Sequence, residues 1–192
     1  MFVCAGSIET FAFAKPIGIG MVEAAASVAC LCEKERPREF VFVGTAGSYG
    51  RCGLLEIVEA HAAVQIEIAV LHGQAYTPMR DFVAYRHGGY RTGYGADVSR
   101  ETSPIVNSSN YITTDAQAAE AMLKRGIDLE NMEFFAVLAT AARYGIPAKG
   151  IFIVTNYCRE DAHAMFLSQH AEAKKRLTEY VITRYIDTKR EV

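Results

Sequence analysis

The stretch "ENMEFFAVLATAARYGIPAKGIFIVTN", residues 130–156, predicts a helix followed closely by a strand. Asn131 is a suitable cap for a helix that runs to Tyr144, and Gly145 is a suitable residue to end it. Residues 150–155 form a short apolar run of the kind found in buried strands. An apolar helix beside an apolar strand is typical of an α/β protein.

The rest of the chain continues this alternation. We expect apolar strands or strand-like stretches at residues 2–5, 11–14, 54–60, 63–71 and near 106, a strand that ends in the glycines of "REFVFVGTAGSYG", and helices at 21–32, 115–124 and 160–185. This order predicts an α/β fold, a three-layer α/β/α sandwich around a mixed, largely parallel sheet, in a single domain over residues 1–192. Residues 72–104 show neither period and predict a long loop, functional or mobile.

Composition excludes several classes of function. The formal net charge is -2, and the 20 basic residues are scattered, so we expect no nucleic-acid partner. The longest apolar run, residues 134–142, is too short for a membrane span of roughly 20 residues. The first residues lack a signal-peptide pattern, which predicts a cytoplasmic protein. Five cysteines, an odd number with three in apolar surroundings, indicate reduced thiols. No second Cys or His pair at ligand spacing follows Cys30 and Cys32, and the five histidines are dispersed, so we expect no metal site.

The glycine-rich segment Gly44 to Ser48 follows a predicted strand. Backbone N–H groups in such a turn can form an anion site, and open α/β sheets bind ligands at the carboxyl ends of their strands. A tight turn that only needs glycine is an equally good explanation.

Glu133 and Asn156 are the two polar residues that stand out in the opening stretch. An acid in the first turn of a helix is favoured wherever it occurs, and Asn156 could be only a turn former. If Asn131 caps the helix, however, the positive helix end should keep Glu133 ionised even when it is partly buried. An ionised carboxylate can accept two hydrogen bonds from a vicinal diol, and an amide can donate to and accept from a heterocycle.

Several motifs together resemble the nucleoside phosphorylase superfamily. They are "NME" before a helix, "YGIP" before an apolar strand ending in "VTN", and, upstream, "PIGIGMVEAAA", "FVFVGTAGSYG" and "SSNYITTD". The motifs occur in the family's order and cover most of the chain from residue 16 onward. The resemblance implies a nucleoside phosphorylase-like fold, no cofactor, and a homo-oligomer that could use the 72–104 segment as a contact.

The resemblance also implies roles for individual residues. Glu133 would bind the ribose 2′- and 3′-hydroxyls, and Met132 would pack on the sugar. Asn156 would hydrogen-bond the purine near N7, and Tyr111 would stack on the base with Ile112 beside it. Thr45 and the backbone of Gly44 and Gly47 would hold the nucleophile.

By this resemblance we expect a purine nucleoside phosphorylase, a pentosyltransferase that moves ribose from a 6-oxopurine nucleoside to inorganic phosphate. Asn156 favours 6-oxopurines, because adenosine-type nucleosidases of the superfamily usually have Asp there as the general acid. Uridine phosphorylases resemble the same pattern. The candidates for binding phosphate are four arginines, Arg51, Arg80, Arg86 and Arg91.

Two alternatives remain open at this point. Glu9, in "AGSIET", could occupy the place of a water-activating acid, and the protein would then be a nucleoside hydrolase. The third possibility is a catalytically silent nucleoside-binding protein.

Overall fold

The computed structural model describes residues 1–95 and 103–187. Its strands are β1 (Phe2–Cys4), β2 (Lys15–Pro16), β3 (Phe40–Ser48), β4 (Ile57–Ala60), β5 (Ala62–Val64), β6 (Phe82–Arg86), β7 (Gly89–Gly93), β8 (Ile105–Ser108), β9 (Leu129–Asn131) and β10 (Ala148–Tyr157). Its helices are α1 (Met21–Glu35), α2 (Ile68–Leu71), α3 (Ala116–Lys124), α4 (Phe134–Tyr144), α5 (Ala162–Val181) and the π-helix η2 (Ile182–Ile186).

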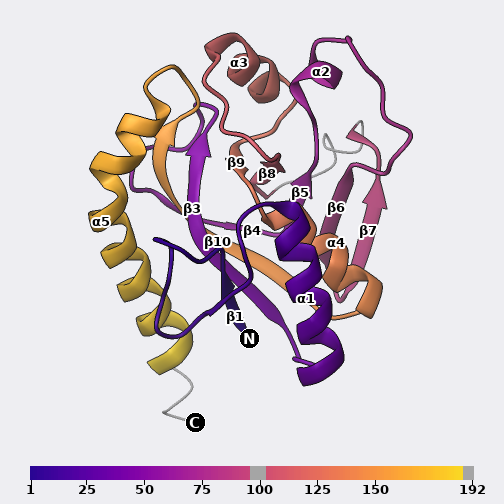
Figure 1. The fold of residues 1–192 in the computed structure, drawn as a ribbon, viewed down its shortest axis with the longest axis vertical. Coiled ribbons are helices and arrows are strands. Elements are labelled where there is room, and N and C mark those ends of the chain that lie inside the picture. The colour runs from indigo at the N-terminus through magenta and orange to yellow at the C-terminus, as the bar shows by residue number, and fades with distance from the viewer. Residues whose placement is uncertain (96–102, 188–192) are drawn as a thin grey trace.

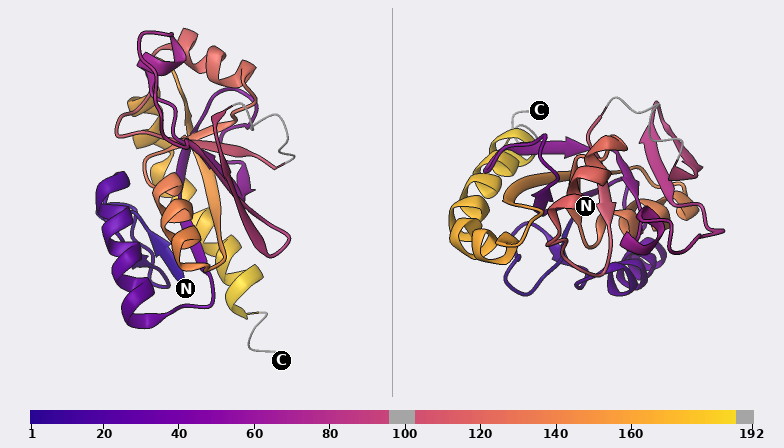
Figure 2. Two further views of the ribbon diagram at one scale, coloured as in Figure 1. Left: turned by 90° about the vertical axis from the view of Figure 1, so that its right-hand side faces the viewer. Right: turned by 90° about the horizontal axis from the view of Figure 1, so that it is seen from above.

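The strands form one mixed sheet. Five strand pairs are parallel and four are antiparallel, and the main order is β2-β1-β3-β9-β8-β5-β6-β7, with β10 between β3 and β4. Helices α1 and α4 cover one side of this sheet and α5 covers the other (Figures 1 and 2). The expected α/β class and mixed sheet are therefore confirmed.

Alternate side chains of β3 pack against the helices on the two faces of the sheet. Phe40 and Phe42 pack in the core that contains α1 and α4, whereas Val41 and Val43 pack in the core that contains α5. Successive side chains of a strand point to opposite faces, so an uninterrupted apolar run is buried on both sides.

Helix α4 forms where the opening stretch predicts it. Its buried apolar residues Phe134, Val137, Leu138 and Ala141 follow the i, i+3, i+4, i+7 spacing of a single helix face. Gly145 ends the helix with a left-handed φ of 65°.

Several local expectations were wrong. Residues 44–48 are not a turn beyond a strand, because β3 continues through them to Ser48. The strand expected at 63–71 stops at Val64, and α2 follows at Ile68. Residues 11–14 form no strand, and the 72–104 segment contains the hairpin of β6 and β7 in its described part, with residues 96–102 outside the described chain.

The edge of β3 opposite β10 is shared by two strands in succession. There β1 pairs as far as Phe42, and β9 pairs from Gly47 onward. Between these pairings, β3 presents Thr45 to the side chains that follow β1 and β9. This interval in the ladder is where the pocket lies.

Candidate active site

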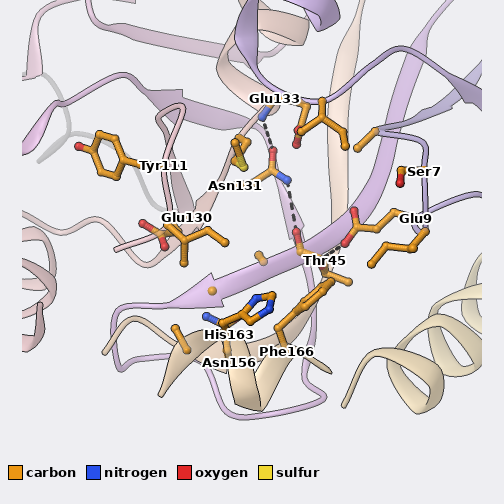
Figure 3. Close-up of a pocket in the computed structure, with 18 of the residues that line it drawn as sticks. Ser7, Glu9, Thr45, Tyr111, Glu130, Asn131, Glu133, Asn156, His163 and Phe166 are labelled. Carbon is orange, nitrogen blue, oxygen red and sulfur yellow. Dashed lines mark hydrogen bonds between the residues drawn. The ribbon is translucent and has the colours of Figure 1, made fainter. Parts of the chain in front are cut away.

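The pocket encloses about 280 Å³ at the ends of β1, β9 and β10, beside the middle of β3 (Figure 3). Its lining comes from the segment after β1, from β3, from the segment before α3, from the β9–α4 junction and from the start of α5. The lining residues are Ala5, Gly6, Ser7, Ile8, Glu9, Ile19, Thr45, Ala46, Gly47, Tyr111, Ile112, Glu130, Asn131, Met132, Glu133, Asn156, Ala162, His163 and Phe166.

Glu133 lies at the start of α4 with only 2% of its surface exposed. Its Oε1 accepts a hydrogen bond of 2.9 Å from the backbone N–H of Gly20. The capping residue of α4 is Glu133 and not Asn131 as expected, but Asn131 Oδ1 accepts from the N–H groups of Glu133 at 2.8 Å and Phe134 at 2.9 Å. Asn131 Nδ2 donates to the carbonyl of Thr45 at 3.3 Å, which ties the helix start to β3.

Burial raises the pKa of Glu133 to about 7, although the hydrogen bond from Gly20 opposes this shift. The nearby carboxylate of Glu9 raises the pKa of Glu133 further. The sequence-based expectation that the helix end keeps Glu133 ionised was therefore wrong, since loss of hydration outweighs the favourable contacts.

Glu9 lies beside Thr45 in the pocket wall. It lies in a tight turn after β1, where its N–H donates to the carbonyl of Gly6 at 2.9 Å and Ser7 takes a left-handed φ of 55°. Thr45 Oγ1 donates a hydrogen bond to Glu9 Oε1 (Figure 3). Burial raises the pKa of the Glu9 carboxyl, against the lowering effect of the Thr45 hydrogen bond.

Gly44 does not line the pocket, although we expected it to hold the nucleophile. A Cβ atom at this position would lie 2.9 Å from the Phe42 ring and 3.3 Å from Glu9 Oε2. Glycine is therefore needed here for close packing, and it leaves room for the Glu9 carboxylate.

A β-bulge turns Asn156 into the pocket. Val154 pairs with Ala46, but the register then shifts so that Asn156 pairs with Gly47, with Thr155 as the extra residue. Without the bulge, Asn156 would share a face with Val154, which packs in the core with α1 and α4. Asn156 Oδ1 accepts a 3.0 Å hydrogen bond from Thr155 Oγ1, and Nδ2 donates to the carbonyl of Tyr157 at 3.3 Å.

The predicted base and sugar contacts also line the pocket. Tyr111 and Met132 are half-buried, and Ile112 is 48% exposed. The Tyr111 hydroxyl points away from the pocket and accepts a hydrogen bond of 2.8 Å from the N–H of Ile68 (Figure 3). The Tyr111 ring is thus held from outside the site.

None of the four candidate arginines lines the pocket. Arg51 is paired with Asp128 at 2.6 Å, and the guanidinium of Arg91 lies 4.8 Å from the centre of the Phe82 ring. Arg80 donates to Thr92, and Arg86 lines a separate cavity. No lysine or arginine of residues 1–95 and 103–187 lines the pocket at all.

Sequence reasoning missed several lining residues. His163 and Phe166 lie three residues apart at the start of α5, a spacing that places both on one helix face just after Asn156. That spacing, so close to Asn156, could have predicted from the sequence that both side chains line the pocket. Glu130 gave no such signal, because its partner Thr113 is 17 residues away in the chain.

The fold and the pocket define an α/β protein of the nucleoside phosphorylase type. The model of the Phosphorylase superfamily matches residues 3–187, and the chain belongs to this family. The comparison with curated proteins found no match.

Solved structures share the fold at low sequence identity. A putative 5′-methylthioadenosine/S-adenosylhomocysteine nucleosidase from Francisella philomiragia has a TM-score of 0.75 and 15% identity, over 95% of this chain and 96% of that one. The S. pneumoniae nucleosidase of that name, bound to the transition-state inhibitor MT-ImmA, has a TM-score of 0.72 and 15% identity, over 94% and 95%. Futalosine hydrolase of Helicobacter pylori has a TM-score of 0.70 and 14% identity, over 86% and 75%.

These findings correct the expected activity. The three similar structures described above are two nucleosidases and a hydrolase. The prediction of a purine nucleoside phosphorylase, a pentosyltransferase with phosphate as co-substrate, was therefore wrong.

Within residues 1–95 and 103–187, no group of three or more His, Cys, Asp or Glu side chains could hold a metal ion. No helix in the same residues is both long and apolar enough to span a bilayer.

Proposed function

We propose that the protein is a nucleosidase that hydrolyses the N-glycosidic bond of a purine nucleoside. The observation that carries this proposal is the pairing of Glu9 with Thr45 in a pocket to which the described residues contribute no lysine or arginine. Phosphate needs cationic or backbone donors, whereas a water nucleophile needs a base. The names of the similar structures support the same activity.

Water attack proceeds through Glu9. The Glu9 carboxylate takes a proton from water as the water oxygen bonds to C1′, and the C1′–N bond breaks with its electron pair going to the base. A carboxyl whose pKa is raised by burial is a better base than an ordinary one. Thr45 holds this carboxylate in place.

Glu133 acts on the sugar. In its ionised form it accepts hydrogen bonds from the 2′- and 3′-hydroxyls and stabilises the positive charge that develops on the ribose. Met132 packs against the sugar ring. Both residues lie at the β9–α4 junction and line the same pocket as Glu9.

Asn156, Tyr111 and Ile112 receive the base. Asn156 Nδ2 donates only one of its two hydrogens to Tyr157, so it has a second for N7 of a purine. The Tyr111 ring stacks on the base, with Ile112 beside it.

Base release without phosphate is the deciding test. Inosine, guanosine, adenosine, methylthioadenosine and uridine are each incubated with the protein, with and without phosphate, and both base and sugar products are measured. We expect free ribose or its 5′-substituted form in both conditions. Release that requires phosphate and yields a sugar 1-phosphate would contradict the proposal.

Replacement of Glu9 tests the role of water activation. Glu9→Gln keeps the shape of the side chain but cannot take a proton, so we expect kcat to fall by about 10²-fold or more. Glu56→Gln is a matched control, because Glu56 lies outside the pocket and accepts from the N–H of Gly53. Equal losses in both variants would exclude Glu9 as the base.

The family resemblance also supports a homo-oligomer in a single-domain chain. Light scattering after size-exclusion chromatography tests this proposal, and a mass of 21.1 kDa at all concentrations would contradict it.

A further inference from the structure

Glu130 is a buried acid in the pocket wall to which the proposed mechanism gives no role. It lies on β9 and is 6% exposed. Its Oε1 accepts from the N–H of Thr113 at 2.9 Å, and its Oε2 accepts from Thr113 Oγ1 at 2.6 Å and from the Tyr49 hydroxyl at 3.1 Å. Burial raises the pKa of Tyr49 well above its ordinary value, so this hydroxyl remains a donor.

These hydrogen bonds hold a segment that lacks regular structure. Between the end of β8 at Ser108 and the start of α3 at Ala116, the chain has neither helix nor strand. Tyr111 and Ile112, which line the pocket, lie in this segment, and Thr113 follows them directly. Because Thr113 is bound through both its backbone and its hydroxyl, Glu130 fixes its position and its orientation.

The other side of Glu130 faces the position of Asn156. A Cβ atom added to Gly47 would lie 3.4 Å from Glu130 Cγ and 3.0 Å from Asn156 Nδ2. Gly47 of β3 pairs with Glu130 of β9 on one side and with Asn156 of β10 on the other, so it separates the two residues in the sheet. Glu130 therefore holds Thr113, the residue next to the Tyr111–Ile112 pair, and lies one strand away from Asn156, with Gly47 between them.

We propose that Glu130 is a positioning residue that sets the spacing between Asn156 and the Tyr111–Ile112 pair. The inference rests on the proposed function, in which the base lies between these residues. Its carboxylate oxygens are occupied by protein donors, so it acts through Thr113 and not by contact with the substrate. We expect Glu130 to affect how tightly the pocket binds the base.

Glu130→Gln is the first variant, and Asp128→Asn is its matched control. Asp128 is also a buried acid, and it accepts from Arg51 Nη1 at 2.6 Å and from the N–H of Ile105 at 2.9 Å. It does not line the pocket. Both variants replace a hydrogen-bonded carboxylate by an amide, so both should lower the melting temperature, but only Glu130→Gln should change base binding.

The kinetic readout separates positioning from stability. For Glu130→Gln we expect KM for the nucleoside to rise about tenfold with kcat changed less than about threefold, as for lost ground-state binding. Thr113→Val, which removes only the hydroxyl, should raise KM in the same direction, and the double variant should be no worse than Glu130→Gln, since both act through one contact. Thr113→Ser should retain the wild-type KM. A KM unchanged in Glu130→Gln, or raised equally in Asp128→Asn, would overturn the proposal.

Two measurements keep the inference independent of turnover. Hydrogen exchange of residues 109–114 should be faster in Glu130→Gln than in the wild type and in Asp128→Asn. Calorimetry with free hypoxanthine and adenine should show weaker binding in Glu130→Gln alone. If the wild type binds a base but cleaves no nucleoside, the proposed nucleosidase function is wrong. The hydrogen exchange and the calorimetry still test the role of Glu130 in that case. Unchanged exchange, or no binding of either base to the wild type, would overturn that role.

Discussion

At the scale of single residues, the carboxyl group of Glu133 is buried, yet its proposed role in binding the ribose needs the ionised form. Its pKa is about 7, whereas the ordinary value is 4.5. Only the ionised form can accept hydrogen bonds from both ribose hydroxyls. We therefore expect kcat/KM to rise between about pH 6 and pH 8, because this parameter follows groups of the free enzyme. A pH–rate profile measures this, and a flat profile would exclude a titrating acid in the site.

The same pKa shift predicts a pH-dependent stability. Since the folded-state pKa is above the unfolded value, Glu133 binds its proton more tightly in the folded protein. Its contribution is fully present below about pH 4.5 and is lost as the pH rises through 7, by about 3 kcal/mol. Urea unfolding at pH 5 and pH 8 should show this loss in the wild type but not in Glu133→Gln. An equal loss in both proteins would assign the effect to other groups.

Glu133→Gln also separates an enzyme from a silent binding protein. Turnover should fall by orders of magnitude if the carboxylate stabilises the sugar cation, whereas a binding protein would lose only modest affinity. Steady-state kinetics together with calorimetry on the variant distinguish these outcomes. An unchanged kcat would exclude the ribose role.

Asn156 predicts the order of substrates. An amide can donate a hydrogen bond to N7 but cannot supply a proton, so bases that leave readily as anions should be released faster. Asn156→Asp restores a proton donor and should shift the ratio of kcat/KM values toward adenosine over inosine by about tenfold or more. Asn156→Leu is the control, and it should slow both substrates. If Asn156→Asp leaves the ratio of kcat/KM for adenosine to kcat/KM for inosine unchanged, contact between residue 156 and N7 is excluded.

At the scale of elements, the start of α4 links helix stability to catalysis through Asn131. Asn131→Ala removes the acceptor for the N–H groups of Glu133 and Phe134 and the contact to Thr45, so we expect a stability loss of about 1 kcal/mol together with a clear loss of activity. Asp115→Ala is the matched control, because Asp115 caps α3 by accepting from the N–H of Gln117 and lies outside the pocket. Urea unfolding and kcat/KM should show similar stability losses but an activity loss only for Asn131→Ala. Similar activity in both variants would contradict the link.

The sequence predicted a helix or strand correctly where neighbouring residues alone determine it. The apolar spacing of α4 and Gly145 are local signals, and the helix forms as expected, although it starts two residues later than a cap at Asn131 would place it. By contrast, β9 is only three residues long and is defined by its pairing with β3 and β8. The glycines of β3 suggested a turn, but they are needed for packing against Glu9, Asn156 and Cys158.

The candidate site shows the same division between local and distant signals. Short motifs carry most of the candidate residues, and all of the candidates except Gly44 and the four arginines line one pocket. The raised pKa of Glu133 depends on burial by segments far along the chain, so the sequence could not reveal it. The bulge that turns Asn156 inward likewise depends on the register between β10 and β3.

At the scale of the whole molecule, the pocket joins segments from most of the chain. Residues 5–9, 45–47, 111–112 and 130–133 contribute to it, as do Asn156 and three residues at the start of α5, Ala162, His163 and Phe166. A ligand that contacts all of them binds only the folded state, and at 100 times its Kd it stabilises that state by about 2.7 kcal/mol. For a chain of this size, 1 kcal/mol corresponds to about 2–4 °C in melting temperature.

We therefore expect a single unfolding transition whose midpoint rises by about 5–10 °C with a saturating purine base and stays unchanged with phosphate alone. Differential scanning calorimetry at several protein concentrations measures both effects and separates ligand binding from self-association. Two transitions, of which the ligand shifts only one, would show that the chain does not unfold as a unit. A rise with phosphate alone would place an anion site in the folded protein and contradict water as the nucleophile, since the pocket would then hold the phosphate that a phosphorylase requires.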